Sequence, residues 1–129
     1  MIESWVAQGG GDGGGTAPVR SGAVAGMLRS RIEAGCLETW LTSSAGRSLG
    51  VVTNTERAMV VLLEGEGDPG EHAVDPSADG ESDGFVLANG QCDEYPDQET
   101  VPLAEALRIV EHIVTAGSWP PDAAWVADR

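Results

Sequence analysis

Apolar residues cluster in short stretches along the middle of the chain, a pattern that is typical of strands. Residues 58–63 form the strongest apolar run and are expected to be a central strand. Residues 49–53 precede them, and a turn at residues 54–57 would make the two an antiparallel pair. Shorter strands are expected at residues 39–42 and, within a polar loop that runs from residue 65 to residue 84, at residues 72–74.

A β-hairpin is expected at residues 85–95, where Asn89-Gly90 separates two strand-like segments. Asn-Gly favours a two-residue turn, because both turn positions need positive φ. In that register Phe85 lies opposite Glu94 and Leu87 lies opposite Cys92.

Two segments have the apolar spacing of amphipathic helices. Residues 103–116 give the stronger pattern, with Thr100 as the expected cap and Gly117 as the expected stop. Residues 21–35 form a weaker candidate. An amphipathic helix needs a partner surface for its apolar face, and a sheet provides one. The expected fold class is therefore α+β, an antiparallel β-sheet of about four to six strands packed on one side by one or two helices.

The N-terminal part differs from the rest in composition. Six glycines and one aspartate make up residues 9–15, too few apolar side chains to offset the entropy of ordering them. Residues 1–22 are therefore expected to be a flexible Gly-rich leader, and residues 23–129 a single α+β domain. A chain of 129 residues has room for one modest core.

Charge adds a functional constraint. Twenty-one carboxylates and seven cations give the chain a net charge of −14, and the stretch from Glu64 to Glu99 contains twelve Asp or Glu but no Lys or Arg. Such a field repels nucleic acid and anionic lipid, so neither is an expected partner, and it attracts a basic partner at raised association rates. The alternative is a solvated acidic surface that only promotes solubility.

The polar residues do not form a recognisable catalytic or metal motif. The two His and two Cys are scattered, whereas zinc sites usually bring paired ligands at short spacing. Residues 75–83 partly match a calcium-binding loop, but Val86 occupies the position where a bidentate Glu should close the shell. No catalytic residue, metal or cofactor is therefore expected; an enzyme would require this acidic segment to organise a metal.

The cellular location can also be predicted. No apolar run approaches the roughly 18 residues of a membrane span, and the first residues lack the basic start and apolar stretch of a signal peptide. A cytoplasmic protein is expected.

Three of the four tryptophans lie in the expected domain. Trp40 and Trp125 are expected to close the core with their N–H groups turned outward. Trp119, flanked by Gly-Ser and Pro-Pro, is expected at the rim, where aromatic residues often anchor interfaces.

Short motifs follow one another in a distinctive order through residues 38–127. They are the strand-like segments 49–52 and 57–63, the acidic loop 70–76, Asn-Gly-Gln-Cys-Asp-Glu-Tyr-Pro at 89–96, Val-Pro at 101–102, Glu-Ala-Leu at 105–107, Gly-Ser-Trp-Pro at 117–120, and Trp125. In this order the chain resembles the immunity protein 1 family of bacterial polymorphic toxin systems.

The resemblance implies a small α+β domain of the immunity type, encoded beside a secreted toxin that often belongs to the nucleic-acid deaminase superfamily. Such a protein binds the cognate toxin domain in the cytoplasm and blocks its active site, with no catalytic residues of its own. The acidic composition agrees, because a deaminase needs a basic groove that carboxylates can occupy in place of phosphates.

The candidate partner-binding residues lie in the acidic loop, around the hairpin and at the rim. They are Asp75, Asp79, Glu81, Asp83, Asp93, Glu94, Tyr95, Asp97, Glu99 and Trp119. An acidic adaptor or regulatory binding module without a toxin partner is the alternative function.

Overall fold

A computed structural model of the chain describes residues 3–8, 16–87 and 90–128. In chain order, the elements within these residues are β1 (Trp5–Gln8), β2 (Thr16–Val19), α1 (Val24–Glu33), β3 (Glu38–Ser43), β4 (Ser48–Thr53), β5 (Arg57–Leu63), β6 (Glu71–Ala73), β7 (Glu81–Val86), β8 (Cys92–Pro96), the 3₁₀ turn η1 (Asp97–Glu99), β9 (Val101–Pro102), α2 (Leu103–Ala116) and β10 (Trp125–Ala127).

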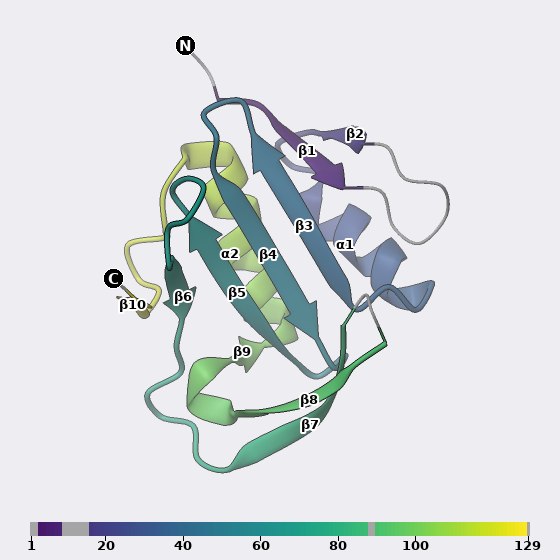
Figure 1. Cartoon of the computed structure of the whole chain (residues 1–129), viewed down its shortest axis with the longest axis vertical. Coiled ribbons are helices and arrows are strands. Elements are labelled where there is room, and N and C mark those ends of the chain that lie inside the picture. The colour runs from purple at the N-terminus through teal and green to yellow at the C-terminus, as the bar shows by residue number, and fades with distance from the viewer. Residues whose placement is uncertain (1–2, 9–15, 88–89, 129) are drawn as a thin grey trace.

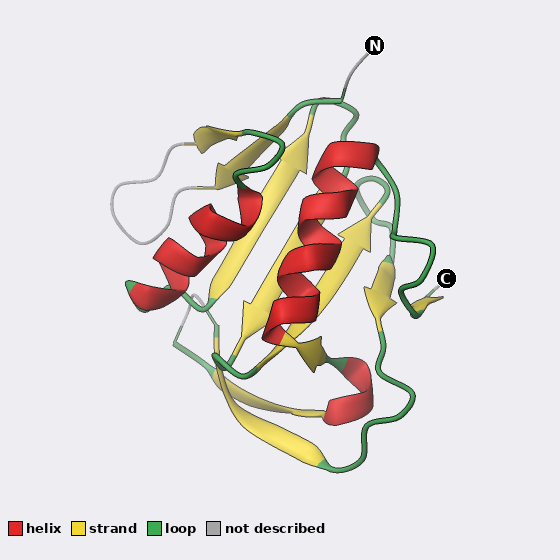
Figure 2. Cartoon of the chain, turned by 180° about the vertical axis from the view of Figure 1, so that it is seen from behind, coloured by secondary structure: helices red, strands yellow, loops and turns green. Residues whose placement is uncertain are grey.

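An antiparallel sheet in the order β10-β6-β5-β4-β3-β1-β2, with β9 beside β5, forms the body of the molecule (Figure 1). Strands β7 and β8 make a separate hairpin at one end. Both helices lie on the same face of the sheet (Figure 2). The α+β prediction is confirmed, and the sheet is wider than the four to six strands expected because the terminal segments add β1, β2 and β10.

The core lies between the sheet and the helices. In β5 the buried side chains are Ala58, Val60 and Leu62, which alternate with half-buried ones. Helix α2 buries the apolar stripe that its sequence predicts, including Leu107 and Val110. Each large apolar side chain in this layer contributes roughly 1.5–3 kcal/mol by leaving water. In the part of the chain that the structure describes, no helix is long and apolar enough to span a lipid bilayer.

The sheet face opposite the helices is called the open face. Strand alternation and cross-strand register place on it Trp40, Val52, Met59, Val61 and Leu63. The β7–β8 hairpin approaches this face at the end of β4, where β4 and β7 are in contact. An antiparallel sheet can leave one face without a covering layer, and here most of it is left that way.

Two segments of the predicted N-terminal leader belong to the sheet, so the prediction of a flexible leader over residues 1–22 is wrong there. Strand β1 pairs with β3, and β2 pairs with β1. Trp5 is only 2% exposed, and the guanidinium of Arg47 lies 5.5 Å from its ring centroid. The buried indole contributes apolar area that the composition of the segment does not indicate. The glycine run at residues 9–15 lies outside the described residues.

The hairpin forms as predicted, but its register is shifted by one residue. Phe85 pairs with Asp93 and Val86 with Cys92, and the amide of Leu87 donates to the Gln91 carbonyl at 2.8 Å. Gly90, just before β8, has φ +88°, a left-handed conformation that favours glycine. Asn89 lies outside the described residues. One consequence of the shift is that Asp93 and Tyr95 are half-buried while Glu94 is exposed.

The two edges of the sheet are short. Strand β2 contains Pro18, which lies opposite Val6 and has no amide hydrogen. At the other edge, β10 has three residues, all exposed, and pairs with β6.

Helix α1 is capped by a side chain from α2. Its own N-cap residue, Ala23, offers no side-chain hydrogen bond. The carboxylate of Glu111 instead accepts the amides of Gly22 at 2.7 Å, Val24 at 3.2 Å and Ala25 at 3.4 Å. A carboxylate at a helix N-terminus satisfies free amides and interacts favourably with the helix dipole.

We expect Glu111→Ala to lower the free energy of unfolding by about 1 kcal/mol, because it removes the cap of α1. Glu105→Ala on the same helix is the matched control, since the ion pair of Glu105 is with the exposed Arg108 and its loss should cost less than about 0.5 kcal/mol. Urea unfolding measures both values. Equal losses would contradict the capping role of Glu111.

Candidate partner-binding site

The acidic segment from Asp75 to Glu99 is attached to the sheet by Arg57, the first residue of β5. Its Nη2 donates to Asp75 Oδ2 at 2.8 Å and to the carbonyls of Thr100 at 3.0 Å and Asp97 at 3.1 Å. Its Nε donates to Thr100 Oγ1 at 2.8 Å, so Thr100 binds Arg57 and does not cap α2 as predicted. The hydrogen bond from Arg57 holds the pKa of Asp75 below its ordinary value.

A second cationic contact comes from His72 on β6. Its Nδ1 lies 2.8 Å from Asp128 Oδ2, beyond β10, and its Nε2 is in ion-pair contact with Glu99 of η1. Burial alone would lower the pKa of His72, but the hydrogen bond and charge of Asp128, together with those of Glu99, outweigh it and raise the pKa above 6.5. His72 thus joins the C-terminal strand to the acidic segment.

Several residues predicted to bind a partner have intramolecular contacts in the folded chain. Asp75, Asp97 and Glu99 contact Arg57 or His72. Asp93 accepts the Tyr95 hydroxyl at 3.1 Å. The Tyr95 ring packs edge-on against the fully buried Phe85, with 4.9 Å between centroids.

The C-terminal tryptophans exchange their predicted places. Trp119, expected at the rim, is only 8% exposed, and its Nε1 donates to Glu71 at 2.9 Å. Trp125, expected in the core, is 42% exposed and stacks on Trp119 with ring centroids 5.7 Å apart. The prediction for Trp125 is wrong because β10 is an edge strand, so the indole covers Trp119 from outside.

The remaining predicted carboxylates are exposed, and three of them line one hollow. This acidic hollow, about 280 Å³ in volume, is lined by Asn54, Glu56, Glu81, Ser82, Asp83 and Glu94. The Asn54 amide fixes β7 by donating to the Asp83 carbonyl at 2.9 Å. None of the four carboxylates forms an ion pair with a described residue. Asp79 is exposed outside the hollow.

Glu56 is a member of the hollow that sequence reasoning missed. It lies in the predicted turn between β4 and β5, about 25 residues before β7, so only the fold brings it to the hairpin. The sequence shows Glu56 only as a carboxylate in an expected turn, which does not indicate that it lies near the hairpin.

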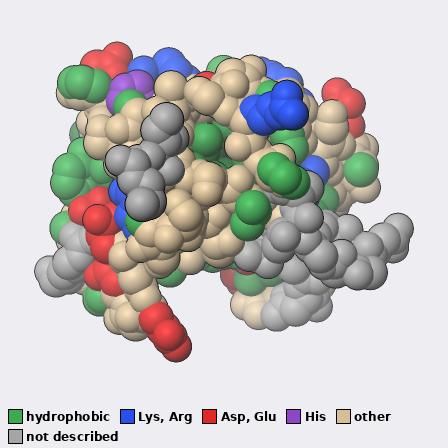
Figure 3. Space-filling model, turned by 90° about the horizontal axis from the view of Figure 1, so that it is seen from above, with side chains coloured by type: hydrophobic (Ala, Val, Ile, Leu, Met, Phe, Trp, Pro, Cys, Tyr) green, Lys and Arg blue, Asp and Glu red, His purple; other side chains and the backbone are tan. Residues whose placement is uncertain are grey.

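Other parts of the surface have mixed charge. Seen from above (Figure 3), the molecule presents basic, acidic and hydrophobic side chains interspersed with one another. Nowhere among the described residues do three or more His, Cys, Asp or Glu side chains converge as potential metal ligands. The chemistry that the hollow itself offers is that of exposed carboxylates, which attract cationic groups.

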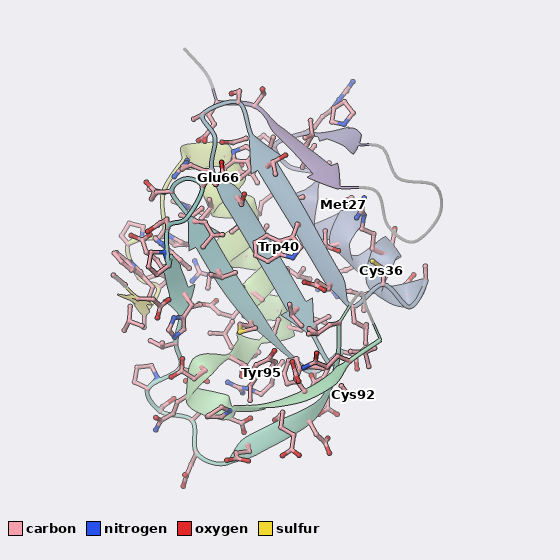
Figure 4. All side chains as sticks on the ribbon, in the orientation of Figure 1. Met27, Cys36, Trp40, Glu66, Cys92 and Tyr95 are labelled. Atoms are coloured by element: carbon pink, nitrogen blue, oxygen red, sulfur yellow. The ribbon has the colours of Figure 1, made fainter. Side chains whose placement is uncertain are left out.

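A second feature that the sequence did not predict is Trp40, which was expected in the core. It lies half-buried on the open face, near the centre of the sheet (Figure 4). A Cβ atom at Gly50 would come within 2.7 Å of its ring, so the indole lies directly against β4. Gly50 pairs with Trp40 across β3 and β4 and leaves room for the indole to lie on β4. This signal can be recognised only when the register of the two strands is known.

Fold and site together define a small α+β protein with an acidic surface hollow. The chain matches no family model, and a search of curated proteins finds no match to it. The resemblance to the immunity protein 1 family therefore stays a prediction.

The raised pKa of His72 predicts a pH-dependent stability. A group whose pKa is higher in the folded chain stabilises fully below its unfolded pKa, about 6.5, and loses this contribution as pH rises through the folded pKa. The free energy of unfolding of the wild type, relative to His72→Gln, should fall as the pH rises above about 6.5 and through the folded pKa of His72.

Chemical denaturation across this pH range measures the difference. His112→Gln is the matched control, because the His112 ring contacts the neutral Ser118 carbonyl. If the wild type and His72→Gln curves stay parallel, His72 does not join these elements through charge.

Proposed function

We propose that this protein is an immunity protein that binds a cognate secreted toxin domain and occupies its basic active-site groove. The observation that carries the proposal is the acidic hollow, which Glu56, Glu81, Asp83 and Glu94 line without an ion pair to a described residue. Such a site attracts a basic surface and accelerates its association.

The arrangement argues against a surface that only promotes solubility. Arg57 and His72 bind three carboxylates of the acidic segment, while four others line one hollow beside the same hairpin. The four lining carboxylates form no ion pair with a described residue, so their charge is available to a basic partner. A surface that only promotes solubility does not need such a division between paired and unpaired carboxylates.

The proposed mechanism is stoichiometric blocking. A toxin that acts on nucleic acid, such as a deaminase, presents a positive groove for the phosphates and admits the target base to a pocket. Carboxylates on the β7–β8 hairpin can occupy that groove in place of phosphates and exclude the substrate. No bond is made or broken by the inhibitor.

The experiment is to co-express the chain with the C-terminal domain encoded by the adjacent reading frame. An equimolar complex that survives purification, together with protection of cells from that domain, is the expected result. If the domain kills cells equally fast with and without this chain, the proposal is wrong. Complexes with unrelated basic proteins but not with this domain would favour an adaptor instead.

A charge-neutralised variant locates the binding site. We expect Glu81→Gln, Asp83→Asn and Glu94→Gln together to slow association with that domain about tenfold at low salt, because the hollow loses its attraction for basic groups. Stopped-flow or surface plasmon resonance measures the rate.

The matched control removes the same three charges elsewhere, by Glu33→Gln, Glu66→Gln and Asp122→Asn. Glu66 lies at the far end of the sheet from Tyr95 and the hairpin (Figure 4). The control should retain most of the association rate. If both triple variants slow association equally, net charge alone matters and the hollow is not the site.

A further inference from the structure

Trp40 has the geometry of a binding residue for a basic side chain. We infer that, in the complex proposed above, the partner extends from the acidic hollow onto the open face and places an arginine against the indole of Trp40. The inference rests on the proposed function. It adds to that proposal a second contact residue, Trp40, a second surface, the open face, and the type of partner side chain, an arginine.

The orientation of the indole is fixed before any partner binds. One ring face lies against β4, since a Cβ at Gly50 would come within 2.7–2.8 Å of three ring atoms. The Nε1 hydrogen is already donated to Glu38 Oε2 at 2.8 Å. The part of Trp40 that can contact a partner is therefore the ring face turned away from Gly50. A preorganised aromatic ring loses little conformational entropy when it binds.

Acidic and aromatic groups connect Trp40 to the hairpin. Glu38 accepts the Trp40 Nε1 hydrogen at 2.8 Å and lies opposite Val52, toward the end of β4 where β4 contacts β7 of the hairpin. Tyr95 belongs to β8, the strand that contributes Glu94 to the hollow. The surface of the hollow thus continues toward Trp40 with negative charge.

This chemistry selects arginine as the occupant. A guanidinium is planar, stacks on an indole face and also binds carboxylates, whereas a lysine ammonium is compact and strongly hydrated. The cation that originates on this face, Arg57, is turned to Asp75, Asp97 and Thr100. A second copy of the chain is a poor occupant, because two molecules of net charge −14 repel each other.

Two substitutions at Trp40 test the contact against a purely structural role. Trp40→Phe keeps an aromatic face, and Trp40→Leu keeps apolar cover over Gly50 without one. Binding of the C-terminal domain encoded by the adjacent reading frame is measured by titration calorimetry. We expect Trp40→Leu to raise Kd about tenfold to thirtyfold and Trp40→Phe to raise it by less than about fivefold.

Urea unfolding shows whether each variant is folded under the binding conditions. A second measurement, hydroxyl-radical footprinting of the wild-type complex, needs no substitution. The oxidation rate of Trp40 should fall at least threefold on binding, while the exposed Trp125 at the sheet edge serves as the internal reference.

The outcomes separate the inference from the proposed function. If the domain binds and the triple variant in the hollow weakens it, but Trp40 is oxidised equally in the complex or Trp40→Leu binds like the wild type, the inference alone is wrong. If Trp40→Phe and Trp40→Leu weaken binding equally, Trp40 acts through packing and the arginine contact is wrong. If the wild type does not bind the domain, both proposals are wrong.

Discussion

The conformation of the acidic segment depends on one guanidinium group. Arg57 begins β5 and binds the loop after β6 through Asp75, η1 through Asp97 and the start of β9 through Thr100. These acceptors are half-buried or buried, so losing the guanidinium would leave the Asp75 carboxylate without its cation, at a cost of roughly 1–3 kcal/mol. In a chain with seven cations and twenty-one carboxylates, this Arg joins three parts of the acidic segment to the sheet, beside the contacts of His72 with Glu99 and of Asn54 with β7.

The carboxylates of this segment divide into two groups by what they contact. Asp75, Asp97 and Glu99 neutralise the cations of the sheet, and they fix a scaffold. Glu81, Asp83 and Glu94 lie on the hairpin that this scaffold supports, and they face the hollow. The first group of carboxylates thus stabilises the fold, and the second group remains exposed at the surface.

The sequence predicted local features well and distant ones poorly. The helical periodicity of α2 and the apolar run of β5 are repeated over many residues, so both elements were found close to their observed bounds. Strand β1 was missed because the burial of Trp5 depends on β3, more than thirty residues away. All acidic side chains look alike in a sequence, and only the positions of Arg57 and His72 distinguish structural carboxylates from those of the hollow. The positions of Trp40 and Trp125 could not be predicted either. Trp40 is half-buried because it lies on the open face, and Trp125 is exposed because β10 is an edge strand, and both facts depend on the order of the strands in the sheet.

The edges of the sheet have a consequence for the behaviour of the protein in a crowded solution. An unpaired β-edge is a template for strands of other chains, and natural proteins block it with proline, charge or brevity. Pro18 removes one donor from β2, and β10 ends the other edge after three residues. Pairing of two molecules through these edges is thereby disfavoured, and the open face is left as the surface of the sheet through which another chain can be bound.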